Sequence, residues 1–597
     1  MRALARRLRA FPRSRLWPLL AALLVVAPTL SAGLALDDVL MRVRLVGADT
    51  PWGDPAWWEL YTFARPELNA ELRDAGLHPW WSDLGVKMRF FRPLSAATHV
   101  LDYTLWPDRP GLHHGHSVLW YLLCVLAVRG VLRLASGVAD EEVRERRANL
   151  GALIFAISAP HVTTVAWLAA RNTLIAFVLG CGVIALHIHG RRQERGRGWW
   201  LAGAVVLTAI GLLASEAALG ALAYVGAWQL CADEGPLRRR LAALVPYAGV
   251  VAVWRALYVR AGFGAANTGI YHDPSTDLPD FLRAVATNLP ALFSCRWALV
   301  PVDGWVFAPS ALHAAAAALG ALLCLGLAAF AWPLLAGDRR ARAWALGSTL
   351  ALLPFAATMP MDRLVLFAGL GAAAVLVEVG TGLGDAGWVA ETPARRRVGA
   401  ALVVVHLIFA GPFGLLRALT LGPGMAMMRS GYAQAPRDEA VPEQTFVYVL
   451  GTFHRVHYTT LMRAAGGEAG VPRRAVVLSS MFQGATMYRV DADTLEVAPE
   501  GGFMAVDMDR IHRRDAAGLA VGDRVRLPEL EIEILERTDD GRPSRAAFHF
   551  DRPLEDPSLR WLIVAPEAAG PLPFGAETQA FELPAIGATV VVEGVGP

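Results

Sequence analysis

The sequence predicts an α-helical polytopic membrane protein with a β-rich domain at its C-terminal end. Three observations predict this fold class. The chain of 597 residues is 55% hydrophobic and 18% charged, and its mean hydropathy of +0.38 is far above that of soluble globular proteins. About 11 apolar segments suit a bilayer crossing. From about residue 431 the composition becomes that of a soluble domain, so we divide the chain into residues 1–430 and 431–597.

The predicted spans form two groups, seven between residues 16 and 259 and four between residues 311 and 416. The first begins at 16–36, which follows a basic N-terminus; its apolar part approaches the roughly 20 residues that a bilayer requires, so we interpret it as a helix and not as a cleaved signal. The other predicted spans are 115–135, 149–166, 173–189, 199–214, 217–230, 241–259, 311–335, 343–360, 364–379 and 398–416. We interpret the apolar stretch 285–300 as re-entrant or interfacial.

The orientation follows from the arginines. Alternate loops are rich in arginine, as cytoplasmic loops are; they are 141–147, 190–198, 236–240, 337–343 and 394–397. This predicts a multi-pass protein of the inner (cell) membrane, with a cytoplasmic N-terminus and an extracytoplasmic C-terminal domain. The net charge of +3 is too small to indicate a nucleic-acid partner. The five cysteines have spacings that suit neither zinc nor a disulfide framework.

Two outer regions have their own character. The long outer loop 37–112 contains the tryptophan-rich texts PWGDPAWWELY and HPWWSDLG, which predict helices at the membrane interface. In residues 431–597, strand-like runs alternate with turns. The runs are TFVYVL, RAVVLSS, LEIEILE, RAAFHF and RWLIVAP.

The adjacent carboxylates of Asp37 and Asp38 are the first candidates for chemistry, because they follow the first span on its outer side. An acidic group over a partly apolar cavity can act as a general base towards a hydroxyl group. A solvated helix end would give the same pattern.

Other polar residues are predicted at the same outer ends of helices, which indicates an outer cavity. Arginines there could bind a phosphate group. The candidates for substrate binding are Arg92, His113, His116, His161, Arg171, Glu216, Asp362 and Arg363, with His114 in the same HHGHS motif.

Each of these candidates also has a structural interpretation. HHGHS suits the start of a helix at the interface, and its spacing is too loose for zinc, so we predict no metal. His161 suits a buried interior histidine, Glu216 a cap between two spans, and Arg363 an interfacial anchor or a partner of Asp362. In the C-terminal domain, GTFHRVHY suits a strand-to-loop surface, and we assign no catalytic role there.

The order of the motifs resembles the C-type (GT-C fold) glycosyltransferases. The motifs are LALDDVLM, FRPLSAATHVLDYTLW, HHGHSVLWYLL, LIFAISAPHVTTVAWLAARNTLIAFVLG, GLLASEAALGALAYV and MDRLVLFAGLG. They cover roughly 16–379, and they are most similar to the O-mannosyltransferase-like proteins that often carry tetratricopeptide repeats.

The resemblance implies a sugar donor on a polyprenyl phosphate and an active site on the non-cytoplasmic face. We expect a protein or glycan acceptor and no cofactor. Asp37 or Asp38 would match the family's acidic pair, whose proposed role is general base. By position and chemistry, Arg92 and Arg363 are candidates for the lipid phosphate.

The chain departs from the family pattern at several positions. Where the family tends to have HPVHVEAVAW and GRKD, this chain has Ser158, Ala159, Pro160 and Thr163, and then ARNT at 170–173. A lysine is missing before Glu216, and a β-rich domain replaces the repeats. Three hypotheses stay open: an active glycosyltransferase, a catalytically degenerate scaffold or cell-envelope assembly protein, and a transporter, although the paired halves typical of transporters are not seen.

Overall fold

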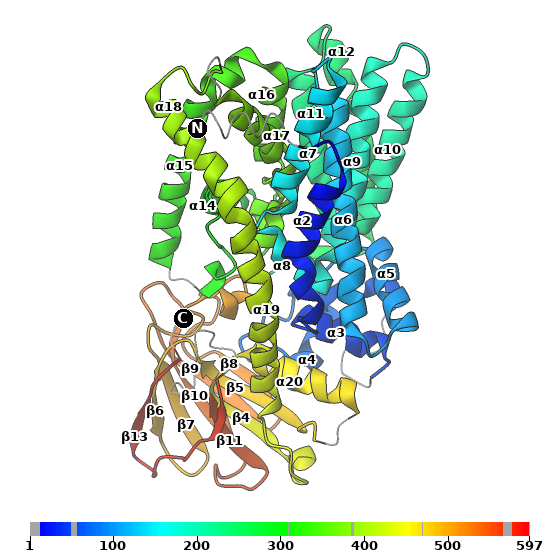
Figure 1. The fold of residues 1–597 in the computed structure, drawn as a ribbon. Coiled ribbons are helices and arrows are strands. Elements are labelled where there is room, and N and C mark those ends of the chain that lie inside the picture. The colour runs from blue at the N-terminus through cyan, green and yellow to red at the C-terminus, as the bar shows by residue number, and fades with distance from the viewer. Residues whose placement is uncertain are drawn as a thin grey trace.

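The computed structural model describes residues 12–48, 56–307, 310–383, 387–467, 470–564 and 576–595. It consists of a helical bundle joined to a C-terminal β-rich domain, which lies at one end of the bundle (Figure 1). The predicted fold class, a helical membrane protein with a C-terminal β-rich domain, is confirmed.

Seven helical segments among the described residues are long and apolar enough to cross a bilayer. Their helices are α6 (Pro110–Ala135), α9 (Arg171–Arg192), α10 (Arg197–Ala214), α12 (Leu237–Ala242) continuing into α13 (Val245–Arg260), α15 (Ser310–Gly337), α17 (Leu366–Gly382), and α18 (Pro393–Val404) continuing into α19 (Ala410–Ala433). Each corresponds to one predicted span.

The other four predicted spans form shorter helices. These are α2 (Leu16–Val26), α7 (Glu141–Ala156), α11 (Leu219–Cys231) and α16 (Arg339–Leu350), with 11, 16, 13 and 12 residues. All are shorter than the roughly 20 residues of a full crossing, so the number of eleven spans stays a prediction. The stretch 285–300 lies mostly in α14 (Leu278–Ala298), which is not among the seven.

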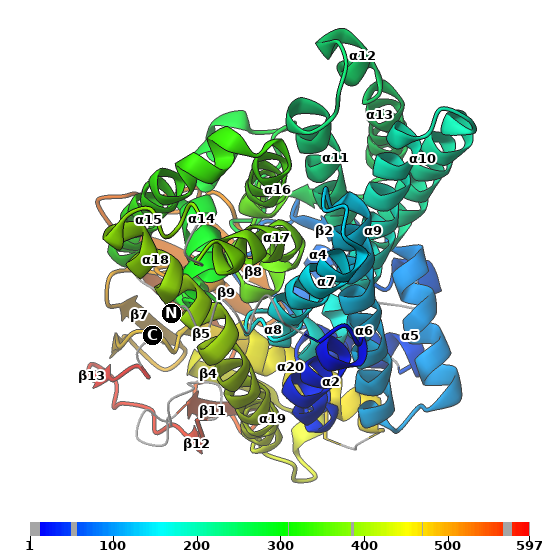
Figure 2. The same ribbon diagram turned by 45° about the horizontal axis from the view of Figure 1, so that its top comes forward.

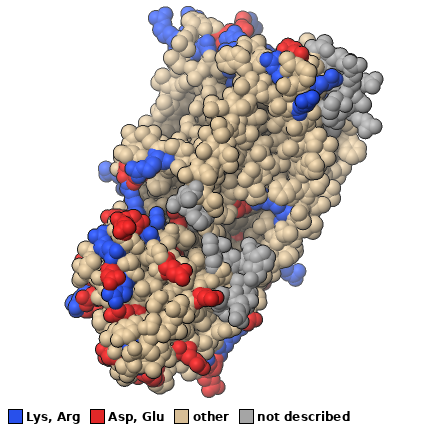
Figure 3. Space-filling model, turned by 90° about the vertical axis from the view of Figure 1, so that its left-hand side faces the viewer, with Lys and Arg blue, Asp and Glu red and all other residues tan. Residues whose placement is uncertain are grey.

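Helix α17 lies at the centre of the bundle (Figure 2). Within its apolar window 89% of the residues are buried, against 11% in α15. Figure 3 shows one face of the molecular surface. Charged side chains gather at the two ends of this face, and a broad band with few charges lies between them. Such a band suits contact with lipid chains. The arginine-rich helices α12, α16 and α18 lie at the end away from the β-rich domain (Figure 1), as the predicted orientation requires.

The C-terminal domain contains two sheets. Strands β6 (Ala485–Arg489), β7 (Thr494–Pro499), β8 (Arg524–Leu527), β9 (Leu530–Arg537), β10 (Pro543–Phe550) and β13 (Thr589–Val592) form an antiparallel sheet in the order β13-β6-β7-β10-β9-β8. Strands β4 (Thr445–Gly451), β5 (Arg474–Ser480), β11 (Leu559–Val564) and β12 (Thr578–Ala580) form the second sheet, in the order β12-β11-β4-β5. All five predicted runs form strands among the described residues, and the last two residues of RWLIVAP lie outside them.

One prediction for this domain was wrong. GTFHRVHY does not form a strand-to-loop surface, because residues Phe453–Gly466 form helix α20. Strands β4 and β5 are parallel neighbours, and parallel strands need a crossover connection, usually a helix. Thr452 caps this helix by accepting a hydrogen bond from the backbone N–H of Arg455.

The outer loop 37–112 forms α3 (Asp37–Leu45), α4 (Pro66–Asp74), α5 (Pro93–Leu105), β1 (Thr62–Ala64) and β2 (Lys87–Arg89). The text HPWWSDLG is not a membrane-interface helix as predicted, because its tryptophans are buried against the C-terminal domain. The indole N–H of Trp80 donates to the carbonyl of Leu478 at 3.2 Å, and that of Trp81 to the carbonyl of Asp509 at 2.8 Å. Part of PWGDPAWWELY lies outside the described residues. The loop therefore fastens the two domains together.

A buried ion cluster joins the start of α17 to α19. The Asp362 carboxylate is fully buried and pairs with Arg417, which also binds Asp303 at 2.7 Å. Asp303 accepts from the hydroxyl of Thr163 at 2.9 Å and from the backbone N–H of Asp362 at 2.9 Å. The backbone N–H of Val302 donates to Asp362 at 2.7 Å. Hydrogen bonds on this scale are what make a buried charge tolerable.

We expect Arg417→Met to lower the free energy of unfolding by about 3–5 kcal/mol, because it leaves the buried carboxylate of Asp362 without its cation. Unfolding of the purified protein in detergent measures this loss. The double variant Arg417→Met/Asp362→Asn should regain part of it, since no buried charge is then left unpaired. An Arg417→Met protein as stable as the wild type would contradict this role.

Candidate active site

A cavity of about 530 Å³ lies where the helical bundle meets the C-terminal domain. From the bundle side it is lined by Asp37, Asp303, Arg363 and Trp167, among other residues. From the C-terminal domain, side chains of α20 and of the segment 508–512 line it. Of the ten residues predicted for the site, Asp37 and Arg363 line this cavity.

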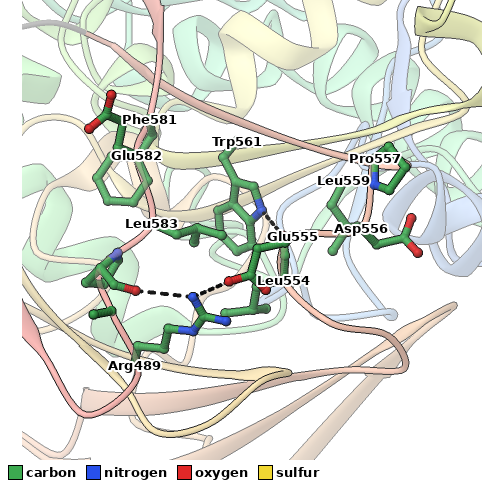
Figure 4. Close-up of a pocket in the computed structure, with 12 residues that line it drawn as sticks. Arg489, Leu554, Glu555, Asp556, Pro557, Leu559, Trp561, Phe581, Glu582 and Leu583 are labelled. Atoms are coloured by element: carbon green, nitrogen blue, oxygen red, sulfur yellow. Dashed lines mark hydrogen bonds and ion pairs between the residues drawn. The ribbon is translucent and has the colours of Figure 1, made fainter.

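A second hollow, of about 570 Å³, lies on the C-terminal domain (Figure 4). Two of its polar side chains are already engaged within its wall: Arg489 pairs with Glu555, and the indole N–H of Trp561 donates to the carbonyl of Leu554 at 2.7 Å. None of the predicted site residues lines it. The cavity at the domain junction is therefore the stronger candidate.

A strained turn delivers Asp37 to the cavity. Leu36 has a φ of 49°, a conformation that costs free energy for a leucine, and α3 begins at the next residue. Arg429 of α19 holds this turn by donating to the carbonyls of Ala32 and Leu34 at 2.9 and 3.0 Å. The ring of His114 bonds to the carbonyl of Gly33 at 2.9 Å. The turn is fixed from two sides.

The two adjacent carboxylates have different surroundings. Asp38 points into the protein, where it accepts from the backbone N–H of Ala169 at 2.8 Å and of Ala35 at 3.3 Å. Asp37 faces the cavity and accepts from the hydroxyl of Tyr458 on α20 at 3.5 Å. Asp38 therefore anchors the loop before α9, and Asp37 is the carboxylate that a ligand can reach.

Burial raises the pKa of Asp37 to about 6, against the opposing effects of Arg363, the Tyr458 hydrogen bond, Arg92 and Arg44. Burial also raises the pKa of Asp38, to about 8. A carboxyl group with a pKa near 6 is ionised at neutral pH and is still a better proton acceptor than an ordinary aspartate. This is the property that a general base needs.

Arg363 is available for an anion. Its guanidinium lies 4.6 Å from the centre of the Trp167 ring, and it makes no ion pair with a carboxylate in the part of the chain that the structure describes. The local pairing considered for Asp362 and Arg363 does not occur, because Asp362 pairs with Arg417. The positive charge of Arg363 acts on Asp37, so the two groups are neighbours across the cavity.

Arg92 and Glu216 form a separate cluster. The Nε of Arg92 donates to Glu216 at 2.7 Å, and the hydroxyl of Tyr258 donates to the other oxygen of Glu216 at 2.7 Å. The guanidinium also lies 5.0 Å from the centre of the Tyr61 ring and 4.7 Å from that of Phe90. Neither Arg92 nor Glu216 lines the cavity.

The remaining predicted residues lie inside the helical bundle. Arg171 pairs with Asp102 at 2.5 Å and donates to the carbonyl of His113 at 2.7 Å, and His116 bonds to the same Asp102 at 2.7 Å. His161 bonds to the hydroxyl of Tyr121 at 3.2 Å. The predicted outer residues thus form several clusters and not one continuous lining.

The C-terminal domain contributes three histidines that line the cavity and were not assigned a role from the sequence. They are His454 and His457 of α20, and His512. A signal for the first two is present in FHRVHY, because residues spaced by three and four share one face of a helix. That signal depends on recognising the segment as a helix. Within the described ranges, no group of three or more histidine, cysteine, aspartate or glutamate side chains could hold a metal ion.

No protein-family model matches the chain, and no curated protein sequence matches it. Similar solved structures include the oligosaccharyltransferase of Archaeoglobus fulgidus with a tethered acceptor peptide, 12% identical over 77% of this chain and 63% of its own, with a TM-score of 0.36. The apo form of the same enzyme is 12% identical over 78% of this chain and 64% of its own, with a TM-score of 0.36.

The arabinofuranosyltransferase AftD from Mycobacteria is 15% identical over 90% of this chain and 41% of its own, also with a TM-score of 0.36. The chain therefore spans less than two thirds of each of these proteins.

In the wild type, the hydrogen bond from Tyr458 stabilises the ionised carboxylate of Asp37. Because Tyr458→Phe removes this bond, we expect it to raise the pKa of Asp37 by about half to one pH unit. Infrared titration of the protonated carboxyl band, identified by its loss in Asp37→Asn, measures the midpoint. In wild type the band should disappear as the pH rises through about 6.

Tyr432→Phe is the matched control for this titration. Its ring stacks on Tyr458 with centroids 5.9 Å apart, but its hydroxyl has no hydrogen-bond partner among the described residues. The control should titrate like wild type. Equal midpoints for Tyr458→Phe and wild type would show that the contact with Asp37 has no influence on the carboxylate.

Proposed function

We propose that this protein is a membrane glycosyltransferase that moves a sugar from a polyprenyl-phosphate donor to an extracytoplasmic hydroxyl group. The observation that carries the proposal is that Asp37 and Arg363 line one cavity. A carboxylate with a raised pKa and an arginine without a carboxylate partner among the described residues are the two groups that this reaction requires. The motif resemblance to C-type glycosyltransferases supports the same reaction.

In the proposed reaction, Asp37 accepts the proton of the acceptor hydroxyl group while the oxygen of that hydroxyl group attacks the anomeric carbon of the donor sugar. The bond between that carbon and the phosphate oxygen breaks, and its electron pair leaves with the lipid phosphate. Arg363 binds the phosphate and stabilises the charge that develops on it. Asp37 later releases the proton to solvent. A phosphate leaving group needs little acid assistance, so one base is sufficient.

The apolar lining of the cavity supports a lipid-linked donor. Six methionines line it, namely Met88, Met359, Met361, Met425, Met428 and Met508. Methionine is flexible and adapts its shape to an apolar partner. Residues 420–428 of α19 contribute to this lining, and Leu416 and Leu419 on the same helix are exposed, so an isoprenoid chain could pass between the lipid and the site along α19.

Asp37→Asn should lower transfer at least 100-fold, because general-base catalysis contributes about 10²–10⁴ in rate. Transfer of radiolabelled sugar from a panel of polyprenyl-phosphate sugars to membrane extract measures this. Asp38→Asn should lose less than tenfold, because an asparagine oxygen can still accept from the backbone N–H of Ala169. Wild-type transfer should fall as the pH drops through about 6, where Asp37 becomes protonated.

No transfer by the wild type from any donor, together with Asp37→Asn complementing a deletion strain, would leave the scaffold hypothesis. Transfer that is lost equally in Asp37→Asn and Asp38→Asn would contradict the distinct surroundings of the two carboxylates.

Arg363→Gln should raise the KM for the lipid-linked donor by roughly 10- to 100-fold, the scale of one or two charge-assisted hydrogen bonds. Arg42→Gln is the matched control, because Arg42 lies on α3 near Asp37 but binds Asp108 outside the cavity. Steady-state kinetics at varied donor concentration separates the two variants. A donor KM that is equal in Arg363→Gln and Arg42→Gln would exclude Arg363 as the phosphate ligand.

A further inference from the structure

Two histidines of the C-terminal domain that line the cavity each have a buried ring nitrogen without a protein partner. The Nδ1 atoms of His454 and His512 are buried and have no hydrogen-bond partner among the described residues, and both side chains line the cavity. The His512 side chain is only 4% exposed. Buried polar groups are nearly always hydrogen-bonded in native proteins, so unpartnered nitrogens beside a cavity point to a ligand.

These rings are neutral at physiological pH. Burial lowers the pKa of His454 to about 3 and holds the pKa of His512 well below its usual value. A neutral imidazole has one nitrogen that donates and one that accepts a hydrogen bond. A hydroxyl group has the same dual character, so the two match.

An aromatic ring lies between the two histidines. Phe453 is centred 3.8 Å from the ring of His454 and 4.6 Å from that of His512, and it also lines the cavity. Among the described residues that line the cavity from this domain, none carries a carboxylate, a guanidinium or an ammonium group. A wall of neutral hydrogen-bonding rings around an apolar face suits a sugar, which presents both hydroxyl groups and C–H faces.

The wall is next to the base. The ring of His454 stacks on that of Tyr458 with centroids 6.1 Å apart, and the hydroxyl of Tyr458 bonds to Asp37. A hydroxyl group held near His454 is therefore close to the carboxylate that would accept its proton. The phosphate-binding arginine comes instead from the start of the α17 segment in the bundle. The donor and acceptor sides of the cavity thus belong to different domains.

We propose that His454, His512 and Phe453 form the acceptor site and bind the hydroxyl groups of a sugar, so that the acceptor is a glycan and not a peptide. This inference rests on the proposed function, because it assigns the second substrate of the same cavity.

Binding is tested without turnover by saturation-transfer NMR on the full chain in nanodiscs, with methyl glycosides of hexoses and pentoses and a serine- and threonine-containing peptide as probes. At least one glycoside should bind the wild type. The double variant His454→Phe/His512→Phe, which keeps the rings and removes the nitrogens, should weaken its binding at least tenfold. His454→Asn/His512→Asn, which keeps a polar atom near each Nδ1, should stay within about threefold of wild type.

His549→Phe is the matched control, because His549 lies on β10 of the same domain outside the cavity. It should bind the glycoside like wild type. Absence of binding by every glycoside, binding of the peptide alone, or equal binding by wild type and the Phe/Phe variant would overturn the inference.

A second arm distinguishes the acceptor from the donor sugar. In Asp37→Asn, a non-turning-over protein, a polyprenyl-phosphate sugar should bind together with the methyl glycoside. Competition between them would assign the histidines to the donor sugar and overturn the acceptor assignment. The transfer assay is independent of these results: glycoside binding without any transfer would reject the proposed function and leave the sugar site standing, whereas transfer to peptides alone would reject only the inference.

Discussion

The candidate site depends on the position of the Asp37 carboxylate in the cavity between the two domains. The burial of this carboxylate and the strained backbone of Leu36 both cost free energy. Arg429 of the last long helix and His114 of α6 both bind backbone carbonyls of that turn. The position of Asp37 therefore follows from the packing of α19 and α6 around the first apolar helix, and any movement of these helices would move the carboxylate.

Two adjacent residues at the start of the α17 segment, Asp362 and Arg363, also have different surroundings. Asp362 is committed to Arg417 and to the backbone of Val302, which leaves Arg363 to face the cavity over Trp167. If Asp362 paired with Arg363 instead, the cavity would have no arginine to bind a phosphate. The salt bridge between Asp362 and Arg417 thus controls the charge of the candidate site, although neither residue lines the cavity.

The sequence predicted the long apolar helices, the β-rich domain and the acidic pair, because hydropathy and strand alternation are local signals. It could not distinguish the roles of Asp37 and Asp38, because their partners lie far along the chain. Asp37 accepts a hydrogen bond from Tyr458, and Asp38 accepts one from the backbone N–H of Ala169. The sequence also did not predict that the histidines of α20 line the cavity. The segment is helical because it connects two parallel strands, which are not recognisable as neighbours from the sequence. Trp80 suits a membrane interface as well as a domain interface.

The position of the C-terminal domain also bears on water. A glycosyl donor that meets a general base beside bulk solvent would be hydrolysed, because water is a competing acceptor. Here α20 lies across the cavity, and Tyr458 contacts the carboxylate directly. Trp80 and Trp81 fasten the outer loop to the same domain. Under the proposed function, a domain that served only to collect acceptors could be tethered loosely, whereas one that shields and orients Asp37 as the base must be fixed against α3. The buried tryptophans and the Tyr458 contact correspond to the second arrangement.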